Sequence, residues 1–153
     1  MSGKYDIDML ADACRRGDVA TVRACLAKGV NVNSNKHTVY GYTPLMAAVR
    51  HNQLEIVRIL LARDDLAIAD NYCSFTALHD ACDFGKADCI ALLGQDRRMT
   101  RQIINMKTNN GQTALMKAVL WGNLSCVEMM SELEGVDWET KNNTGHSLED
   151  IAR

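Results

Sequence analysis

The sequence is poor in several features that mark large classes of proteins. It contains one proline, two tryptophans, four tyrosines and two phenylalanines in 153 residues, and its formal net charge is −2. Its longest unbroken apolar run, Cys89 to Leu93, has five residues and is too short to cross a bilayer. A charge close to zero gives no general attraction to nucleic acid or to an anionic membrane. We therefore expect a partner that is neither a nucleic acid nor a membrane.

The sequence also lacks the short motifs that mark common catalytic, phosphate-binding and metal-binding sites. There is no G-x-S-x-G, no phosphate-binding glycine loop, no H-E-x-x-H and no C-x-x-C. His79 and Cys82 are three positions apart on an expected helix, but zinc needs three or four ligands. We expect no catalytic residue, no metal, no cofactor and no enzymatic activity.

The composition is that of a folded domain in a reducing compartment. The first residues, MSGKYDID, lack the apolar segment of a secretory signal. This favours the cytoplasm or the nucleus, where the six cysteines stay thiols. An apolar content of 47% and a charged content of 24% are typical of soluble globular proteins. We expect a single domain over residues 1–153 and a monomer.

The single proline shows how the chain is organised. Pro44 follows Thr43 and precedes an apolar run. Thr before Pro is a helix-start signal, because the hydroxyl caps a free backbone N–H and proline is tolerated in the first turn. Similar starts recur at intervals of 33 to 37 residues, at Asp8, Thr76, Thr113 and Ser147.

Each start predicts a short helix, a tight turn and a second helix. Nine positions after the start stands a residue that tolerates the left-handed conformation ending a helix, at Gly17, Asn52, Gly85 and Gly122. Apolar residues then recur at helical spacing, as in Leu54, Val57 and Leu60. Helices this short are marginal alone, so we expect the units to pack on one another.

This unit resembles the ankyrin repeat, whose motif of about 33 residues includes T-P-L-H-x-A. The resemblance covers nearly the whole chain, with approximate units at residues 6–40, 41–73, 74–110 and 111–144 and a partial unit at 145–153. It implies an all-α solenoid of stacked antiparallel helix pairs with projecting β-hairpin-like fingers. His79 is the one copy of the motif histidine and is expected to make structural hydrogen bonds at its helix start.

Cysteines and inserted residues are interpreted against this pattern. Five cysteines stand where other units carry core residues and are expected to pack there: Cys14, Cys25, Cys82, Cys89 and Cys126. Cys73 falls on an expected finger tip. The third connector carries four extra residues within GQDRRMTRQ, which predicts a bulging loop. We interpret its arginines as solvated, with a phosphate or acidic-peptide contact as the alternative: Arg97, Arg98 and Arg101.

The resemblance also implies positions that packing does not fix, namely the finger tips and the last two residues of each first helix, which line a concave face. Of the aromatic residues, only Tyr5 and Trp138 lie elsewhere. The predicted partner-binding set is Tyr40, Tyr42, Arg50, His51, Tyr72, Phe75, Asp83, Phe84, Asn109, Leu120 and Trp121. The alternative is that some rings, Tyr42 and Phe75 above all, cover neighbouring fingers.

These observations predict a non-enzymatic protein–protein interaction module, a scaffold or adaptor that binds a protein or peptide segment on its concave face. Two alternatives remain open. The segment LAKGVNVN resembles ankyrin targets of asparaginyl hydroxylation, with Asn33 as the acceptor. The last unit stops after one helix, which is expected either of a natural cap or of a targeting domain cut from a larger signalling protein.

Overall fold

The protein is a stack of short helices joined by tight turns and loops. The computed structural model describes residues 5–34, 42–69 and 74–153. The helices are α1 (Ile7–Arg16), α2 (Val19–Ala27), α3 (Pro44–Arg50), α4 (Leu54–Leu61), α5 (Ala77–Asp83), α6 (Ala87–Gly94), α7 (Arg101–Ile104), α8 (Ala114–Leu120), α9 (Leu124–Ser131) and α10 (Leu148–Ala152). Within the described ranges there is no regular β-strand. Among these helices none is long and apolar enough to span a bilayer.

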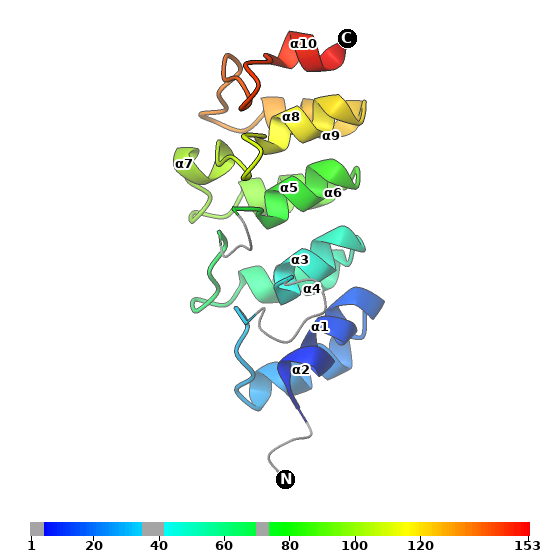
Figure 1. Ribbon diagram of the computed structural model, residues 1–153. Helices are drawn as coiled ribbons and strands as arrows, with labels where there is room; N and C mark the ends of the chain where they lie inside the picture. Colours follow the sequence, from blue (N-terminus) through cyan, green and yellow to red (C-terminus); the bar gives the residue numbers. More distant parts are fainter. Residues whose placement is uncertain (1–4, 35–41, 70–73) are drawn as a thin grey trace.

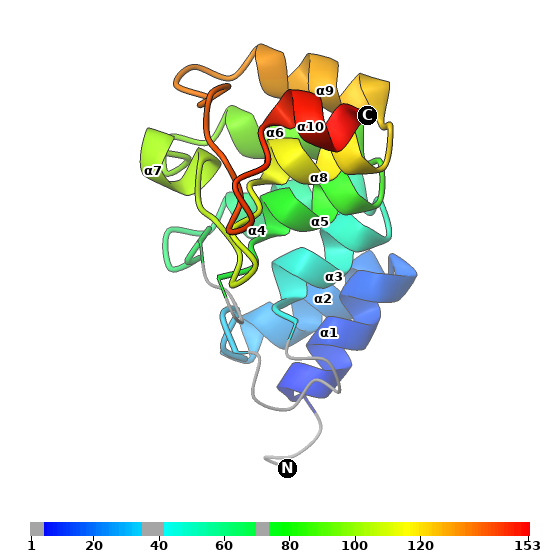
Figure 2. The ribbon, with the colours of Figure 1, turned by 45° about the horizontal axis from the view of Figure 1, so that its top comes forward.

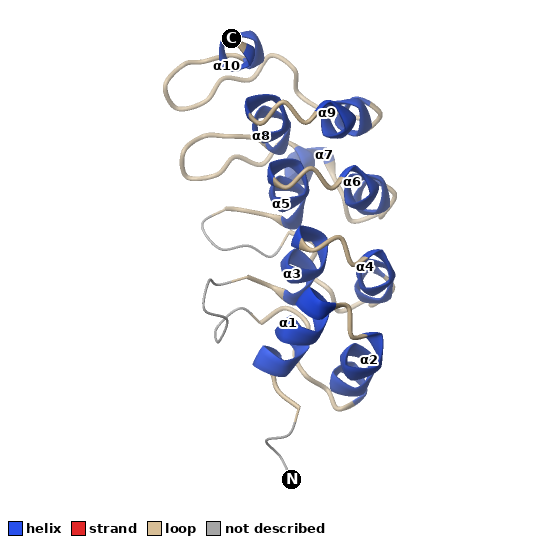
Figure 3. Cartoon of the chain, turned by 90° about the vertical axis from the view of Figure 1, so that its right-hand side faces the viewer, coloured by secondary structure: helices blue, strands red, loops and turns tan. Residues whose placement is uncertain are grey.

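The helices lie in two rows along an elongated molecule (Figure 1). The first row consists of α1, α3, α5, α8 and α10, each packed on the next, and the second row of α2, α4, α6 and α9. Figure 2 shows the first row in front of the second. Each first-row helix from α1 to α8 also packs on its partner in the second row, and the described fingers, at residues 107–112 and 141–146, project on the side of the first row (Figure 3). The predicted all-α solenoid of stacked helix pairs is confirmed.

Side-chain caps start most first-row helices where the sequence predicted them. The hydroxyls of Thr43 and Thr113 each accept a hydrogen bond at 3.2 Å from the backbone N–H three residues on. The prediction was wrong for the first helix. There Asp6 is the cap, since its carboxylate accepts from the backbone N–H of Met9 at 2.8 Å. Asp8 lies inside the first turn, where a negative charge favours the helix N-terminus.

The turns that join the two helices of each pair stack in line. The residues predicted to be left-handed all have positive φ, namely Gly17, Asn52, Gly85 and Gly122. Neighbouring turns touch through amide side chains: Gln53 Nε2 donates to the carbonyl of Arg15 at 3.1 Å, and Asn123 Nδ2 donates to that of Cys82 at 2.8 Å. The stacking is close enough that a Cβ at Gly17 would lie 2.5 Å from Oε1 of Gln53. These contacts hold the first pair in register with the second and the third pair in register with the fourth.

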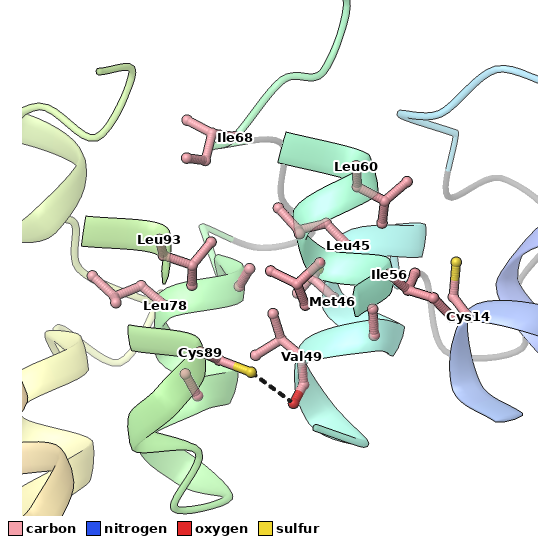
Figure 4. Packing of buried hydrophobic residues seen from close by; sticks show 14 of the residues in the cluster. Cys14, Leu45, Met46, Val49, Ile56, Leu60, Ile68, Leu78, Cys89 and Leu93 are labelled. Atoms are coloured by element: carbon pink, nitrogen blue, oxygen red, sulfur yellow. Dashed lines mark hydrogen bonds between the residues drawn. The ribbon is translucent and has the colours of Figure 1, made fainter. Parts of the chain in front are cut away.

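Aliphatic residues, methionine and cysteine form the core of the described residues. The five cysteines expected to pack are all buried free thiols, whereas Cys73 lies outside the described residues. Figure 4 shows Cys89 between the second and third pairs, with its Sγ donating to the carbonyl of Val49 at 3.8 Å. Burial raises the pKa of Cys14 to about 12 and that of Cys89 to about 11, so these thiols stay protonated. The buried core of the described residues contains no Phe, Tyr or Trp side chain, although Tyr5, Tyr42 and Phe75 pack against it.

The third connector projects at the side of the stack (Figure 1) and contains a short helix where the sequence predicted a bulging loop. The inserted residues form the short helix α7, whose start is capped by Thr100 through a 3.4 Å hydrogen bond from the backbone N–H of Ile103. Ile104 at its end is buried, and this apolar anchor folds the insert back onto the stack.

Arg98 was wrongly interpreted as solvated. Its guanidinium turns back onto the connector after α4 and donates to the carbonyls of Leu61 at 2.7 Å, Arg63 at 2.7 Å and Leu66 at 3.1 Å. Asp96 completes the site with 2.8 Å hydrogen bonds to Nε and Nη2. The side chain of Arg97 beside it is 87% exposed, as expected. Arg98 therefore clamps two connectors together.

Candidate partner-binding surface

The described members of the predicted binding set lie along the first row, at helix ends and finger bases, except Asn109, which lies in the turn of its finger. Tyr40 and Tyr72 lie outside the described residues. The remaining members fall into two groups. Tyr42, Arg50, Phe75 and Asp83 are half-buried. The exposed members are His51, Phe84, Asn109, Leu120 and Trp121.

Arg50 is the centre of the half-buried group. It comes from the last turn of α3, and its guanidinium carbon lies 3.9 Å from the ring centroid of Tyr42 and 4.5 Å from that of Phe84. Its Nη2 is 2.9 Å from Oδ1 of Asp80 on the next pair. Stacking of guanidinium on aromatic faces is favourable, so Arg50 joins α3 to α5.

Asp80 was not selected from the sequence, although it is central to this contact. Its side chain is completely buried, and its Oδ2 has no hydrogen-bond partner within the described residues. Burial raises the pKa of Asp80 to about 6, and the hydrogen bond and charge of Arg50 oppose this rise. The signal available in the sequence was a carboxylate at the position that Ala47 holds in the previous unit.

A second contact joins α5 to α8. The carboxylate of Asp83 accepts from Nε1 of Trp121 at 2.9 Å and pairs with Nζ of Lys117 at 3.2 Å. Lys117 also lies 5.0 Å from the ring centroid of Phe75, which is partly buried against the core together with Tyr42. Both rings thus contact the core, while the alternative interpretation, that they cover neighbouring fingers, stays a prediction.

His79 has the structural role expected of it. Its Nδ1 accepts from the backbone N–H of Thr76 at 3.1 Å, and its Nε2 faces the carbonyls of Met106 at 2.9 Å and Gln112 at 3.2 Å. This arrangement requires the neutral ring with its proton on Nε2. Burial lowers the pKa of His79 to about 4, against the effect of the two carbonyls. The described residues contain no group of three or more potential metal ligands.

The exposed members form an apolar edge, which we define as Phe84, Leu120 and Trp121. They are 47%, 49% and 63% exposed, and they lie where α5 and α8 end. The hydrogen bond from Trp121 to Asp83 fixes the indole over the preceding pair. Leu124, at the start of α9, is 74% exposed beside the same turn and was not selected from the sequence. Large rings held in place but open to solvent are what a recognition surface provides.

Asparagine side chains tie fingers and connectors together. Asn143 Nδ2 donates to the carbonyl of the exposed Asn109 at 2.9 Å. Asn33 donates from Nδ2 to the carbonyl of Asp65 at 2.7 Å and accepts at Oδ1 from the backbone N–H of Ala67 at 2.8 Å. Asn105 repeats the second arrangement further along the chain. Asn33 thus has a structural role that does not depend on modification.

Hydroxylation of Asn33 stays a prediction with a direct measurement. Peptide mass spectrometry on the protein made in animal cells should find one added oxygen on Asn33. Asn105 is the internal control and should carry no added oxygen, although its amide has the same kind of hydrogen-bond partners as that of Asn33. An unmodified Asn33 peptide would remove the hypothesis.

Comparison with known proteins agrees with this architecture. A family model described as ankyrin repeats matches residues 4–70 and 64–142. The E3 ubiquitin-protein ligase XBAT33 of Arabidopsis thaliana is 30% identical over 146 residues, covering 80% of this chain and 28% of that protein. The "Probable 26S proteasome regulatory subunit p28" of Saccharomyces cerevisiae is 26% identical over 141 residues, covering 92% of this chain and 60% of that protein. The chain therefore spans less than two thirds of either relative.

Proposed function

The chain belongs to the ankyrin-repeat family, whose members are typically non-enzymatic protein-interaction modules, and from this premise we propose that it binds a linear segment of a partner protein along its first row of helices. The apolar edge would supply most of the binding free energy. The half-buried contacts around Arg50 and Asp83 would hold that edge in a fixed geometry before the partner arrives.

One observation carries the proposal. The described core is packed with aliphatic residues, methionine and cysteine, yet Phe84, Leu120 and Trp121 stand together in solvent at the ends of α5 and α8. Exposed apolar side chains scattered singly are normal on proteins, whereas a fixed cluster on one edge favours an interaction site.

The test is a selection followed by affinity measurements. Peptides tiled from a proteome are displayed and selected on the wild-type chain, and the Kd of the retained peptides is measured for the Leu120→Ala/Trp121→Ala variant. Central tryptophans in interfaces often contribute 2 kcal/mol or more, so we expect a loss of at least about 30-fold. The free energy of unfolding should change by no more than about 1 kcal/mol, because Leu120 is half exposed and Trp121 is mostly exposed.

Trp138→Ala is the matched control. Trp138 is 47% exposed, as Phe84 is, but it lies in the connector after α9. Its replacement should leave the Kd unchanged. Peptides that bind the double variant as tightly as the wild type, or lose affinity equally with Trp138→Ala, would contradict the proposed surface.

The proposal assigns partner binding to this chain and nothing more. XBAT33 is named as a ubiquitin ligase, but the match covers only 28% of it. We therefore propose no ligase chemistry for these residues. A role as the targeting part of a longer protein is compatible with this proposal.

A further inference from the structure

We propose that the partner segment is acidic at one end and apolar at the other, with its carboxylates over Arg15, His51 and Lys86 and its apolar side chains on Phe84, Leu120 and Trp121. This inference rests on the proposed function and specifies the chemistry of its ligand. It concerns one strip of surface, which we name the turn edge and define by these six residues.

The turn edge is continuous because the turns stack. Arg15 lies in the last turn of α1, His51 follows α3, Lys86 precedes α6 and Trp121 follows α8. The hydrogen bond from Gln53 to the carbonyl of Arg15 brings the first two turns into contact. The hydrogen bond from Asn123 to Cys82 does the same for the third and fourth turns. Figure 3 looks onto this side of the stack, with the turns one above another.

Positive charge gathers at the N-terminal part of the turn edge. Partial burial is the largest cause that lowers the pKa of His51. The next causes are the positive charges of Arg15 on α1, Arg50 on α3 and Lys86 before α6. All three are cations, so the electrostatic potential at His51 is positive. Arg15 also forms an ion pair with Asp12, with 2.7 Å between Nη2 and Oδ1. This pair orients the Arg15 side chain and neutralises part of its charge. An acidic segment would complement this end.

The positive charge decreases toward the other end of the turn edge, where the apolar side chains lie. The carboxylate of Asp83 is already engaged by Lys117 and by the indole of Trp121. Phe84, Leu120 and Trp121 then present apolar area without a free cation among them. Arg50 links the two ends, since it stacks on Phe84 and contributes to the field at His51. The two chemistries thus lie in a fixed order along one strip, which fixes the direction of the bound segment.

The peptide selection described above also tests this inference. Retained sequences should be enriched in Asp and Glu on one side of a Leu, Phe or Trp anchor. The Kd of such a peptide should weaken at least about tenfold with His51→Glu/Lys86→Glu and should also weaken with added salt. Glutamate at position 86 suits the start of α6, so the variant is expected to fold.

Arg23→Glu/Arg58→Glu is the matched control. These arginines are exposed on α2 and α4 in the second row, and the variant makes the chain more negative by at least as much. We expect its Kd to stay within about twofold of the wild type, because neither arginine belongs to the turn edge and salt screens the interactions of exposed charges.

The outcomes separate the two proposals. Peptides that need Leu120 and Trp121 but show no acidic enrichment, or that bind the two charge variants equally, would overturn this inference and leave the proposed function standing. Peptides that are acidic but indifferent to Leu120 and Trp121 would overturn both. If no peptide is retained, both are contradicted, since each requires a linear segment as ligand.

Discussion

Replacing Arg98 by alanine should lower the free energy of unfolding by roughly 3 kcal/mol, because it removes the guanidinium hydrogen bonds to three carbonyls and to the carboxylate of Asp96, which keeps only the backbone N–H of residue 98. The lost hydrogen bonds are those that join the connector after α4 to the connector after α6. In a stacked array each such interface adds to the stability of the whole, so the transition should shift to lower denaturant concentration. Urea unfolding monitored by circular dichroism measures it.

The neighbouring arginine gives the control for this prediction. Arg97 is 87% exposed, and its ion pair with Asp64 spans 3.7 Å between exposed groups, so Arg97→Ala should change the free energy by less than about 0.5 kcal/mol. Arg98→Lys keeps the charge but cannot reach all the acceptors, and its stability should lie between the two. Equal midpoints for Arg97→Ala and Arg98→Ala would show that the clamp contributes nothing.

The second large effect is a pair of opposing pH dependences at adjacent residues. His79 is neutral in the fold down to a pKa of about 4, but in the unfolded chain it takes up a proton below about 6.5, so its contribution falls as the pH drops through this range. Asp80 takes up a proton in the fold at a pKa of about 6, but in the unfolded chain only near 3.8, so its contribution rises over nearly the same range. Each is worth roughly 3 kcal/mol, and they largely cancel.

Asp80→Asn should expose the histidine's dependence. Between pH 6.5 and 4.5, this variant should lose roughly 2 kcal/mol more stability than the wild type does, because the compensating carboxyl is gone. His79→Gln should show the reverse slope and gain stability relative to the wild type as the pH falls. Urea titrations at several pH values give these slopes, and the comparison is independent of the absolute cost of each substitution.

A slope for Asp80→Asn that matches the wild type would contradict the raised pKa of Asp80. The carboxylates with lowered pKa, such as Asp12, Asp18 and Asp96, titrate in all three proteins and therefore drop out of the difference. His51, whose pKa is also lowered, drops out in the same way.

The helix pairs could be predicted because their signals are local. Thr43 caps a helix through an N–H three residues away, and Gly17 ends one through its own backbone conformation. The error at Asp8 has the same origin, since Asp6 and Asp8 are both capable caps two positions apart. Only the packing of Ile7 into the core decides that the helix starts at the earlier residue.

What escaped prediction depends on contacts between distant residues. The acceptors of Arg98 lie between 32 and 37 positions away, and no repeat pattern relates an inserted arginine to them. The same holds for Arg50 and Asp80, which are 30 positions apart. A periodic motif shows which positions are free of packing within one unit. It does not show which neighbour will occupy them, and so Arg50 and Asp83 were grouped with the open residues Leu120 and Trp121.

Three side chains join neighbouring connectors, namely Asn33, Arg98 and Asn105, and they do so with different chemical groups. Asn33 joins the connector after α2 to the one after α4, and Asn105 joins the one after α6 to the one after α9, each with a neutral amide. Between them the joint depends on the inserted Arg98. An array trimmed there to the common repeat length would therefore look more regular and yet transmit less of its folding cooperativity, because the irregular segment adds a joint between its two halves to the packing of α3 on α5 and of α4 on α6.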